Sequence, residues 1–118
     1  MYKEGGEKAR ERCNLIIEYG KKYEKSLKNI KNRHNEKKTL NMIVNHIKQC
    51  SDFQSLSTNP ISLMFGYEPL KYELNGYYSF NLNKNGGKIR LIFSIKDENI
   101  VELDYISVEH YEDFKNKI

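Results

Sequence analysis

The sequence predicts one α+β domain, in which a helix hairpin packs on one face of a mainly antiparallel four-stranded sheet. Three observations lead to this prediction. Apolar residues recur at helical spacing between Lys21 and Cys50, three short segments between Tyr77 and Ile106 alternate in polarity, and polar turns separate those segments. The expected element order is β-α-α-β-β-β-α, and 118 residues suit a single domain.

The N-terminal region allows two interpretations. Residues 1–12 are charged, contain two adjacent glycines and are expected to be flexible. Asn14–Tyr19 is β-branched and aromatic and is followed by Gly20, which favours a strand. Apolar residues here also recur at spacings of three and four, so one helix from about Glu7 to Arg33 fits as well. Periodicity leaves both alternatives open.

Beyond Gly20 the pattern indicates two helices. The first has an apolar stripe formed by Tyr23, Leu27 and Ile30. The second runs to about Cys50, and its apolar face consists of Leu40, Ile43, Val44 and Ile47. Because only a short polar break separates the two helices, they should pack as an antiparallel hairpin. Ser51–Glu68 is rich in Ser, Asn and Pro and is expected to form a loop.

Three alternating segments predict the strands of the sheet. We expect them at Tyr77–Leu82, Lys88–Ile95 and Ile100–Ile106, and a short polar helix at Glu109–Lys117. Asn83 to Gly87 supplies the turn chemistry of a hairpin between the first two strands.

The alternation also assigns side chains to faces. Arg90 lies between apolar residues that should face the helices, so it is expected on the opposite face. Ser79 and Asn81 should share the face of Arg90. An antiparallel sheet with helices on one side leaves its other face free for a ligand. In the last strand, one side should carry Val101, Leu103 and Tyr105.

The net charge of +4 is unevenly distributed. Residues 1–60 carry 13 Lys and Arg against 7 Asp and Glu, whereas residues 61–118 carry 7 against 9. The basic charge is densest from Lys21 to Lys38, with eight basic and two acidic residues. Such a surface attracts a polyanion, and Lys25 and Lys28 are its candidate contacts with one. A merely solvated helix face is the alternative.

Composition argues against export, membrane insertion and metal binding. No apolar run approaches the ~18 residues that a membrane span needs, and the N-terminus lacks the apolar core of a secretory signal. We therefore expect a cytoplasmic protein with no membrane partner. Cys13 and Cys50 are expected to be reduced thiols. His46 lies four residues before Cys50, but two ligands are too few for a metal site.

Glu68-Pro-Leu-Lys71, followed by Gly76-Tyr-Tyr-Ser79, resembles a segment of YoeB-type toxins. The chain is in this respect similar to toxins of the RelE/ParE superfamily, in particular those of the YoeB and YafQ kind. Lys88–Phe93 is similar to the strand that carries their catalytic arginine, and His110-Tyr111 matches the pair with which YoeB-type chains end. The likeness spans roughly residues 14–114 and favours a strand near the N-terminus.

The resemblance implies a RelE-like fold and the toxin of a type II toxin–antitoxin system, a ribosome-dependent mRNA endonuclease. Glu68 matches the general base, His110 the general acid and Arg90 the cation that binds the phosphate. Tyr111 would position the phosphate or stack on a base. The implied partners are a cognate antitoxin, the ribosome and mRNA. Cleavage of this kind calls for no metal and no small-molecule cofactor.

One departure from the family pattern keeps other functions open. Ser79-Phe80-Asn81 stands where relatives carry basic residues, and Lys71 and Lys88 are the candidate RNA-binding residues that would compensate. A ParE-like DNA gyrase poison is one alternative, although that class lacks an acid–base pair such as Glu68 and His110. A non-catalytic RNA- or protein-binding module on the same fold is the other.

Overall fold

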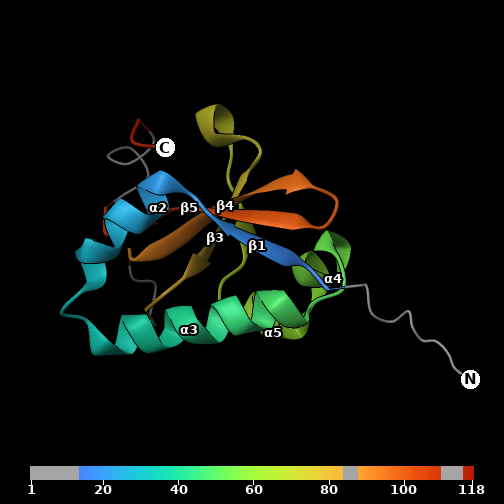
Figure 1. The fold of residues 1–118 in the computed structure, drawn as a ribbon, viewed down its shortest axis with the longest axis horizontal. Helices are drawn as coiled ribbons and strands as arrows, with labels where there is room; N and C mark the ends of the chain where they lie inside the picture. Colours follow the sequence, from blue (N-terminus) through green and yellow to red (C-terminus); the bar gives the residue numbers. More distant parts are fainter. Residues whose placement is uncertain (1–13, 84–87, 110–115) are drawn as a thin grey trace, which may run out of the picture.

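The computed structural model describes residues 14–83, 88–109 and 116–118. A central sheet is covered on one face by a long helix, α3 (His34–Gln49). Figure 1 shows α3 along one side of the sheet, whereas the short 3₁₀ turn η3 (Tyr72–Leu74) projects from the opposite side. The α+β class, the helix hairpin and the mainly antiparallel sheet that the sequence predicted are confirmed.

The sheet has five strands in the order β1-β5-β4-β3-β2. They are β1 (Ile16–Tyr19), β2 (Glu68–Pro69), β3 (Tyr77–Asn81), β4 (Arg90–Asp97) and β5 (Ile100–Ser107). Strand β1 pairs with β5 in parallel, and all other pairs are antiparallel. The predicted count of four was too low because β2, only two residues long, shows no alternation in the sequence.

The N-terminal segment is a strand, so the alternative of one helix from Glu7 to Arg33 is wrong. Strand β1 ends at Tyr19, and the N–H of the next residue, Gly20, donates to the Leu103 carbonyl oxygen at 2.9 Å. A Cβ atom at position 20 would lie 2.9 Å from that same oxygen, so the approach of the two strands requires glycine. Pairing with a segment more than 80 residues away decided the conformation, and local periodicity cannot detect such pairing.

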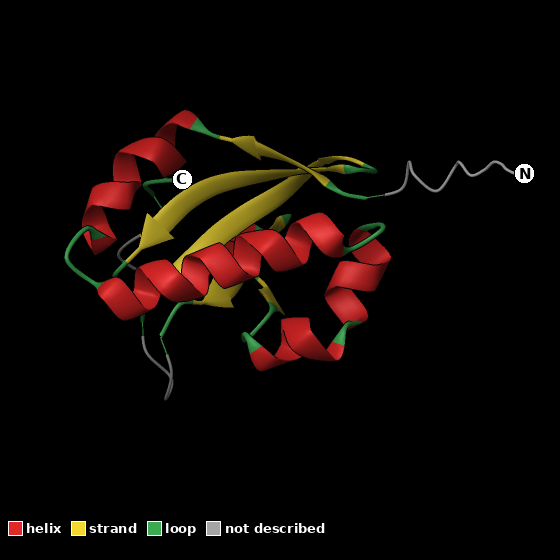
Figure 2. Ribbon diagram, turned by 60° about the horizontal axis from the view of Figure 1, so that its bottom comes forward, coloured by secondary structure: helices red, strands yellow, loops and turns green. Residues whose placement is uncertain are grey.

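The two halves of the helix hairpin play different roles. Helix α3 lies across the face of the sheet, whereas α2 (Lys21–Ser26) and the 3₁₀ turn η2 (Leu27–Ile30) run along the edge of β5 (Figure 2). Ser26 Oγ accepts a hydrogen bond from the Ile106 N–H at 2.7 Å, and Asn29 Nδ2 donates to the Ile106 carbonyl at 2.8 Å. These side chains provide hydrogen-bond partners for the N–H and the carbonyl group of Ile106, at a point of β5 where β1 no longer pairs with it.

Ser51–Glu68 is not a loop as predicted, because it contains two short helices, α4 (Phe53–Thr58) and α5 (Pro60–Met64). Asp52 caps α4 by accepting from the Ser55 N–H at 2.8 Å. Asn59 caps α5, and proline occupies its first turn. Composition pointed to a loop, but these residues are also the preferred N-caps and first helical residues of short helices.

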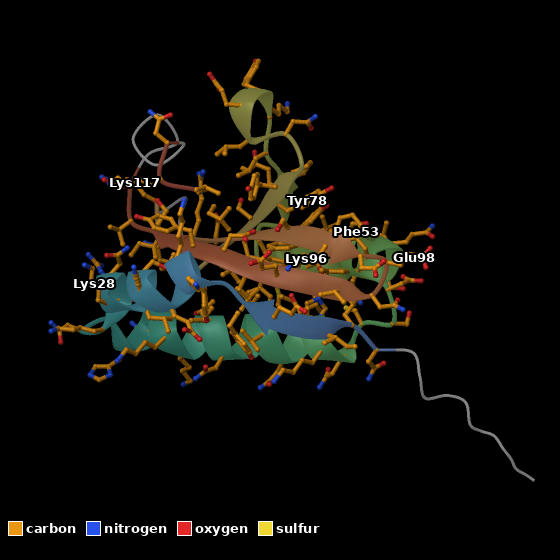
Figure 3. The ribbon with its side chains drawn as sticks, turned by 45° about the horizontal axis from the view of Figure 1, so that its top comes forward. Lys28, Phe53, Tyr78, Lys96, Glu98 and Lys117 are labelled. Atoms are coloured by element: carbon orange, nitrogen blue, oxygen red, sulfur yellow. The ribbon has the colours of Figure 1, made fainter. Side chains whose placement is uncertain are left out.

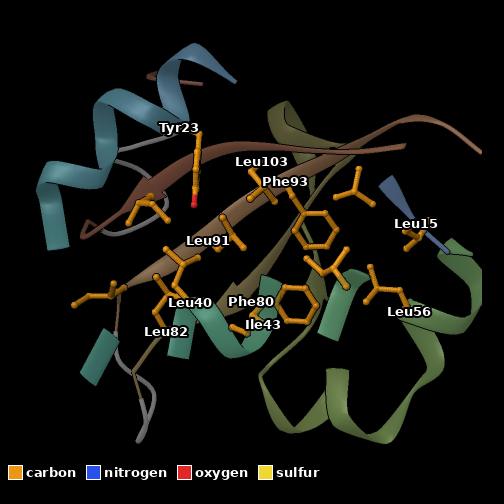
Figure 4. Packing of buried hydrophobic residues seen from close by; sticks show 14 of the residues in the cluster. Leu15, Tyr23, Leu40, Ile43, Leu56, Phe80, Leu82, Leu91, Phe93 and Leu103 are labelled. Atoms are coloured by element: carbon orange, nitrogen blue, oxygen red, sulfur yellow. The ribbon is translucent and has the colours of Figure 1, made fainter. Parts of the chain in front are cut away.

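The main core lies between α3 and the sheet (Figure 4). The predicted apolar faces of the first two hairpin strands are confirmed there, with Phe80, Leu91 and Phe93 completely buried. The third strand differs from the prediction. A β-bulge in β5 places one extra residue, Asp104, opposite the step from Ile92 to Phe93. The bulge moves Tyr105 to the other face, and Ile106 joins the core in its place.

Some predictions fall on residues outside the described part. The predicted last helix, Glu109–Lys117, lies largely within residues 110–115, and Cys13 precedes the first described residue. Cys50 is a buried free thiol. In the described part of the chain, no helix combines the length and the apolar character needed to cross a membrane.

Candidate active site on the sheet face opposite α3

Strand register places Arg90 on the sheet face away from α3, as predicted. Arg90 is the first residue of β4 and pairs with Asn81 on β3 and with Ser107 on β5. Paired residues of an antiparallel sheet point to the same face. The neighbours of Arg90 in sequence, Ile89 and Leu91, are buried in the main core on the α3 side. The guanidinium group therefore lies over the face that the helix hairpin leaves uncovered.

Glu68 joins Arg90 on this face because it belongs to β2. It pairs with Ser79 of β3, so its side chain projects from the same face as Ser79 and Asn81. Glu68 is exposed to solvent. Glu68 is level with Ile92, two residues along β4 from Arg90, and β3 separates β2 from β4. The backbones that carry Glu68 and Arg90 are therefore about 12 Å apart, a span that two long side chains can share around one phosphate group.

Gly66 forms the turn that leads into β2. Gly66 has a φ angle of +76°, a left-handed conformation that favours glycine. A Cβ atom there would lie 2.4 Å from Asn81 Nδ2. The Asn81 N–H donates to the Phe65 carbonyl oxygen at 2.8 Å, which ties this turn to β3 two residues before Glu68. This hydrogen bond holds the chain beside β3, where Glu68 pairs with Ser79 and its carboxylate lies on the face of Arg90.

The face is only partly free, which corrects the expectation of an uncovered surface. A second, smaller core lies on it, where Leu70 and Leu74 pack over Ile92 of β4. Partly buried hydrophobic residues around them are Tyr77, Tyr105 and Ile118. The segment that follows β2 folds back over the middle of the sheet, so the accessible part near Arg90 is confined to one end of β3 and β4.

Unpaired polar atoms mark this face. Among the described residues, four buried side-chain atoms have no hydrogen-bond partner: Ser79 Oγ, Asn83 Oδ1, Arg90 Nε and Asp104 Oδ2. Arg90 lies one row along the sheet from Ser79, and Asp104 lies further along β5. Buried polar groups in native proteins are nearly always paired. Their concentration here is typical of a site that holds a polar ligand.

The far end of the face holds a small cavity with charges of both signs. Asp104 and Glu102 line a cavity of about 240 Å³ together with Tyr77, Lys21 and Lys22. Burial raises the pKa of the Asp104 carboxyl to about 6, and the Glu102 carboxylate adds to the rise. A hydrogen bond with Ser94 and the charge of Lys96 act in the opposite direction. Two carboxylates and two lysines thus meet in this cavity, away from Arg90.

The four predicted RNA-binding lysines lie at different places around the sheet. Lys25 and Lys28 are exposed on α2 and η2, which contact β5 next to Ser107. Figure 3 shows Lys28 at the end of the molecule formed by η2. Lys88 precedes β4 and is exposed close to Arg90 in the chain. Lys71 is exposed too, but it follows Leu70, whose N–H donates to the Tyr77 carbonyl oxygen at the end of β3 that is farther from Arg90. The structure thus places all four predicted RNA-binding lysines at the surface, on three separate segments.

The remaining predicted site residues, His110 and Tyr111, lie outside the described residues, so their roles stay predictions. His46 is structural, since its Nε2 atom lies 2.7 Å from Ser62 Oγ and its side chain is buried. Burial lowers the pKa of this histidine. Across the described residues, no group of three or more His, Cys, Asp or Glu side chains is placed to hold a metal ion.

Sequence reasoning assigned Glu68 and Arg90 but gave no role to Ser79 or Asp104. Alternation placed Ser79 on the correct face, but no sequence signal shows that its hydroxyl is buried without a partner. The burial of Asp104 follows from the β5 bulge, for which the sequence also carries no clear signal.

The chain matches known proteins by structure but not by sequence. No family model matches the chain, and no curated protein matches it by sequence. Solved structures do match. YafQ from E. coli is 18% identical, with a TM-score of 0.56 over 80% of this chain and 92% of that one. YoeB in its heterotetrameric complex with YefM from Staphylococcus aureus is 21% identical, with a TM-score of 0.52 over 82% of this chain and 99% of that one.

A third match extends the range of relatives. A YoeB/ParE toxin from Agrobacterium tumefaciens is 11% identical, with a TM-score of 0.57 over 81% of this chain and all of that one. At such identities the likeness concerns the fold. The chain therefore has the fold of the RelE/ParE-superfamily toxins related to YoeB and YafQ, as the sequence resemblance implied.

Proposed function

We propose that this chain is the toxin of a type II toxin–antitoxin pair and that it cuts mRNA on the ribosome without a metal ion. The observation that carries the proposal is the position of Glu68 and Arg90 on one face of a YoeB-like sheet, beside the unpaired polar atoms Ser79 Oγ and Arg90 Nε. The fold alone would not carry it, because function lies in the site.

The chemistry suits these residues. Cleavage of RNA through its own 2′-hydroxyl needs a base for that hydroxyl, an acid for the departing 5′-oxygen and donors for the charge on the phosphate. Glu68 is solvent-exposed and would act as the base. Arg90 offers two parallel N–H groups to two phosphate oxygens. The acid and the second phosphate contact are assigned to His110 and Tyr111 by resemblance.

The surface around the site suits a ribosomal substrate. The helix hairpin carries most of the net positive charge. It contacts β5 at Ile106, the residue before Ser107, which pairs with Arg90. We infer that this hairpin binds ribosomal RNA while the sheet face receives the mRNA. Lys71 precedes β3 in the chain and Lys88 follows it. Both would contact the RNA backbone in place of the basic residues that relatives carry on β3.

The partner that would neutralise the toxin is a cognate antitoxin. Solved structures with this fold include the DinJ–YafQ and YoeB–YefM toxin–antitoxin complexes. An acidic segment of the antitoxin would compete for the same cations that hold the phosphate, because both ligands need Arg90. Co-expression with the neighbouring antitoxin gene should then restore growth to cells that express this chain.

The decisive experiment is brief expression followed by mapping of mRNA 5′ ends, with single-turnover cleavage on programmed ribosomes. Arg90→Ala should slow cleavage by about 100-fold or more, as loss of one oxyanion donor does, and Arg90→Lys should recover only part of that rate. Glu68→Gln and His110→Ala should each slow it by roughly 10²- to 10⁴-fold. Lys48→Ala, an exposed cation on α3, is the matched control and should cleave normally.

Reversing charge on the hairpin tests the ribosome contact separately. Lys25, Lys28 and Lys31 are all exposed, so their replacement by Glu should leave the fold intact. We expect weaker ribosome association and a flatter dependence on salt concentration, because fewer counterions are released. Unchanged binding would show that the hairpin is a solvated surface. Near-normal cleavage by both Arg90→Ala and His110→Ala would show that the chemistry lies elsewhere.

A ParE-like gyrase poison is the second candidate, favoured by the likeness to the YoeB/ParE toxin from Agrobacterium tumefaciens. The two functions separate cleanly in one experiment. Intact mRNA together with inhibited DNA supercoiling by purified gyrase would support the second candidate, whereas new mRNA 5′ ends with normal supercoiling would support the first.

A further inference from the structure

Ser79 is the one serine in the described core whose hydroxyl is buried and unpaired. Its side chain is 0% exposed, and Ser79 Oγ has no hydrogen-bond partner. The other completely buried serines are paired. Ser62 Oγ lies 2.7 Å from His46 Nε2, and Ser107 Oγ accepts from the Glu109 N–H at 3.1 Å. A buried hydroxyl without a partner destabilises a fold, so its presence calls for another reason.

The position of Ser79 suggests that reason. Strand register places it directly opposite Glu68 on β2 and one row from Arg90 on β4. Side chains that are directly opposite have Cβ atoms about 5 Å apart, and diagonal neighbours lie roughly 7–8 Å apart. Arg90 Nε is itself buried and unpaired. An unpaired donor on Arg90 and an unpaired hydroxyl on Ser79 therefore lie on neighbouring strands of one face, and the exposed Glu68 projects from the strand on the other side of Ser79.

We propose that Ser79 is a positioning residue that couples Glu68 to Arg90 when RNA is bound; the inference rests on the proposed endonuclease function. Ser79 Oγ accepts a hydrogen bond from the Arg90 Nε–H, which leaves the two terminal NH₂ groups aimed at the phosphate. The same hydroxyl donates a hydrogen bond to the Glu68 carboxylate and holds that carboxylate towards the 2′-hydroxyl of the RNA. A hydroxyl is suited to this place because it donates and accepts at once.

The coupling has a measurable electrostatic signature. A hydrogen bond donated to a carboxylate stabilises its charged form and lowers its pKa. Loss of the Ser79 hydroxyl should therefore remove this stabilisation of the charged carboxylate. The acidic limb of the pH–rate profile would move to higher pH, a change that loss of packing alone would not produce.

The stability of the free protein supplies a second, opposite signature. Ser79→Ala removes an unpaired buried hydroxyl, so we expect the melting temperature to rise by roughly 4 °C while activity falls. Ser62→Ala is the matched control, because it also truncates a completely buried serine but leaves His46 Nε2 without its partner. That variant should melt at a lower temperature and cleave at the wild-type rate under conditions where it is folded.

The test is single-turnover cleavage of mRNA on programmed ribosomes across pH 5–9, with melting curves of the free proteins. Ser79→Ala should cleave roughly 10- to 100-fold more slowly, as a misplaced reacting group does, with the acidic limb moved up by about half a pH unit or more. Ser79→Cys, of similar size, should cleave slowly too because a thiol is a weak hydrogen-bonding group. In an Arg90→Ala background, Ser79→Ala should slow cleavage much less.

The outcomes separate the inference from the function on which it rests. Normal cleavage by Ser79→Ala with an unshifted profile overturns the inference and leaves the endonuclease intact. A slower rate together with a lower melting temperature and an unshifted profile also overturns it, because Ser79 would then act only through packing. Absence of cleavage by the wild type overturns the function and the inference together.

Discussion

Replacement of Asp104 by asparagine should stabilise the protein at neutral pH but not in acid. Asp104 occupies the β5 bulge, where burial raises the pKa of its carboxyl from 3.8 to about 6. Asp104 Oδ2 has no hydrogen-bond partner. The folded protein thus binds a proton at this carboxyl more tightly than the unfolded chain does. Asparagine keeps the shape and hydrogen-bonding capacity of the protonated acid without its charge.

The size of the effect follows from the two pKa values. The difference between 3.8 and about 6 corresponds to about 3 kcal/mol if it is fully realised. The side chain is only partly buried, so solvent screening reduces this figure, and we expect about 1 to 2 kcal/mol. Lys96 keeps its ion pair with Glu18 at 3.3 Å in the variant, which limits any compensating loss.

The sign of the pH dependence is fixed by linkage. Because the folded-state pKa is the higher one, the destabilisation by Asp104 is absent below about pH 4 and complete above about pH 6. Urea unfolding of the wild type and Asp104→Asn at pH 4 and pH 7.5 measures it directly. The two proteins should be equally stable at pH 4, and the variant more stable at pH 7.5.

A matched carboxylate provides the control for this measurement. Glu98 is exposed in the turn between β4 and β5 (Figure 3), so Glu98→Gln should change stability little at either pH. A stability gain for Asp104→Asn that is as large at pH 4 as at pH 7.5 would refute the electrostatic explanation, and so would a loss at neutral pH.

Two further predictions concern contacts that hold the site in place. Gly66→Ala should destabilise the fold by about 2 kcal/mol or more in urea unfolding, because the left-handed conformation strains any side chain and the new Cβ would press on Asn81; wild-type stability would show that this turn relaxes freely. Ser26→Ala should cost about 1 to 3 kcal/mol, since it leaves the buried Ile106 N–H unpaired at the β5 edge. Hydrogen exchange at the Ile106 amide should speed up in that variant, and unaltered protection there would contradict the assigned bond.

Sequence patterns predicted the parts of this protein that depend on local physics. Alternation assigned Arg90 and the buried residues of β3 and β4 to their correct faces, because a strand has a strict period of two. The helical stripe that includes Ile43 and Ile47 marked α3, and both residues are completely buried. Resemblance supplied Glu68 and the superfamily, and the solved structures agree with it on the fold.

Other features depended on contacts between distant segments, which local patterns do not encode. Residues 16–19 form a strand because β5 offers them a free edge, although helical periodicity fitted the same residues. Glu68 entered a strand only because β3 pairs with it. The β5 bulge turned Tyr105 away from the core, and a shift of one residue in a strand inverts every later side chain.

The sequence by itself therefore determined the fold class, the long helix, the three central strands and the face on which Arg90 lies, because apolar spacing and strand alternation specify burial directly. Only the tertiary structure decided that Glu68 shares this face, that a second core covers its middle, and that the hydroxyl of Ser79 and the carboxyl of Asp104 are buried without full pairing. Each of these features arises where segments far apart in the chain meet. Their energetics depend on register and burial rather than on the identity of neighbouring residues.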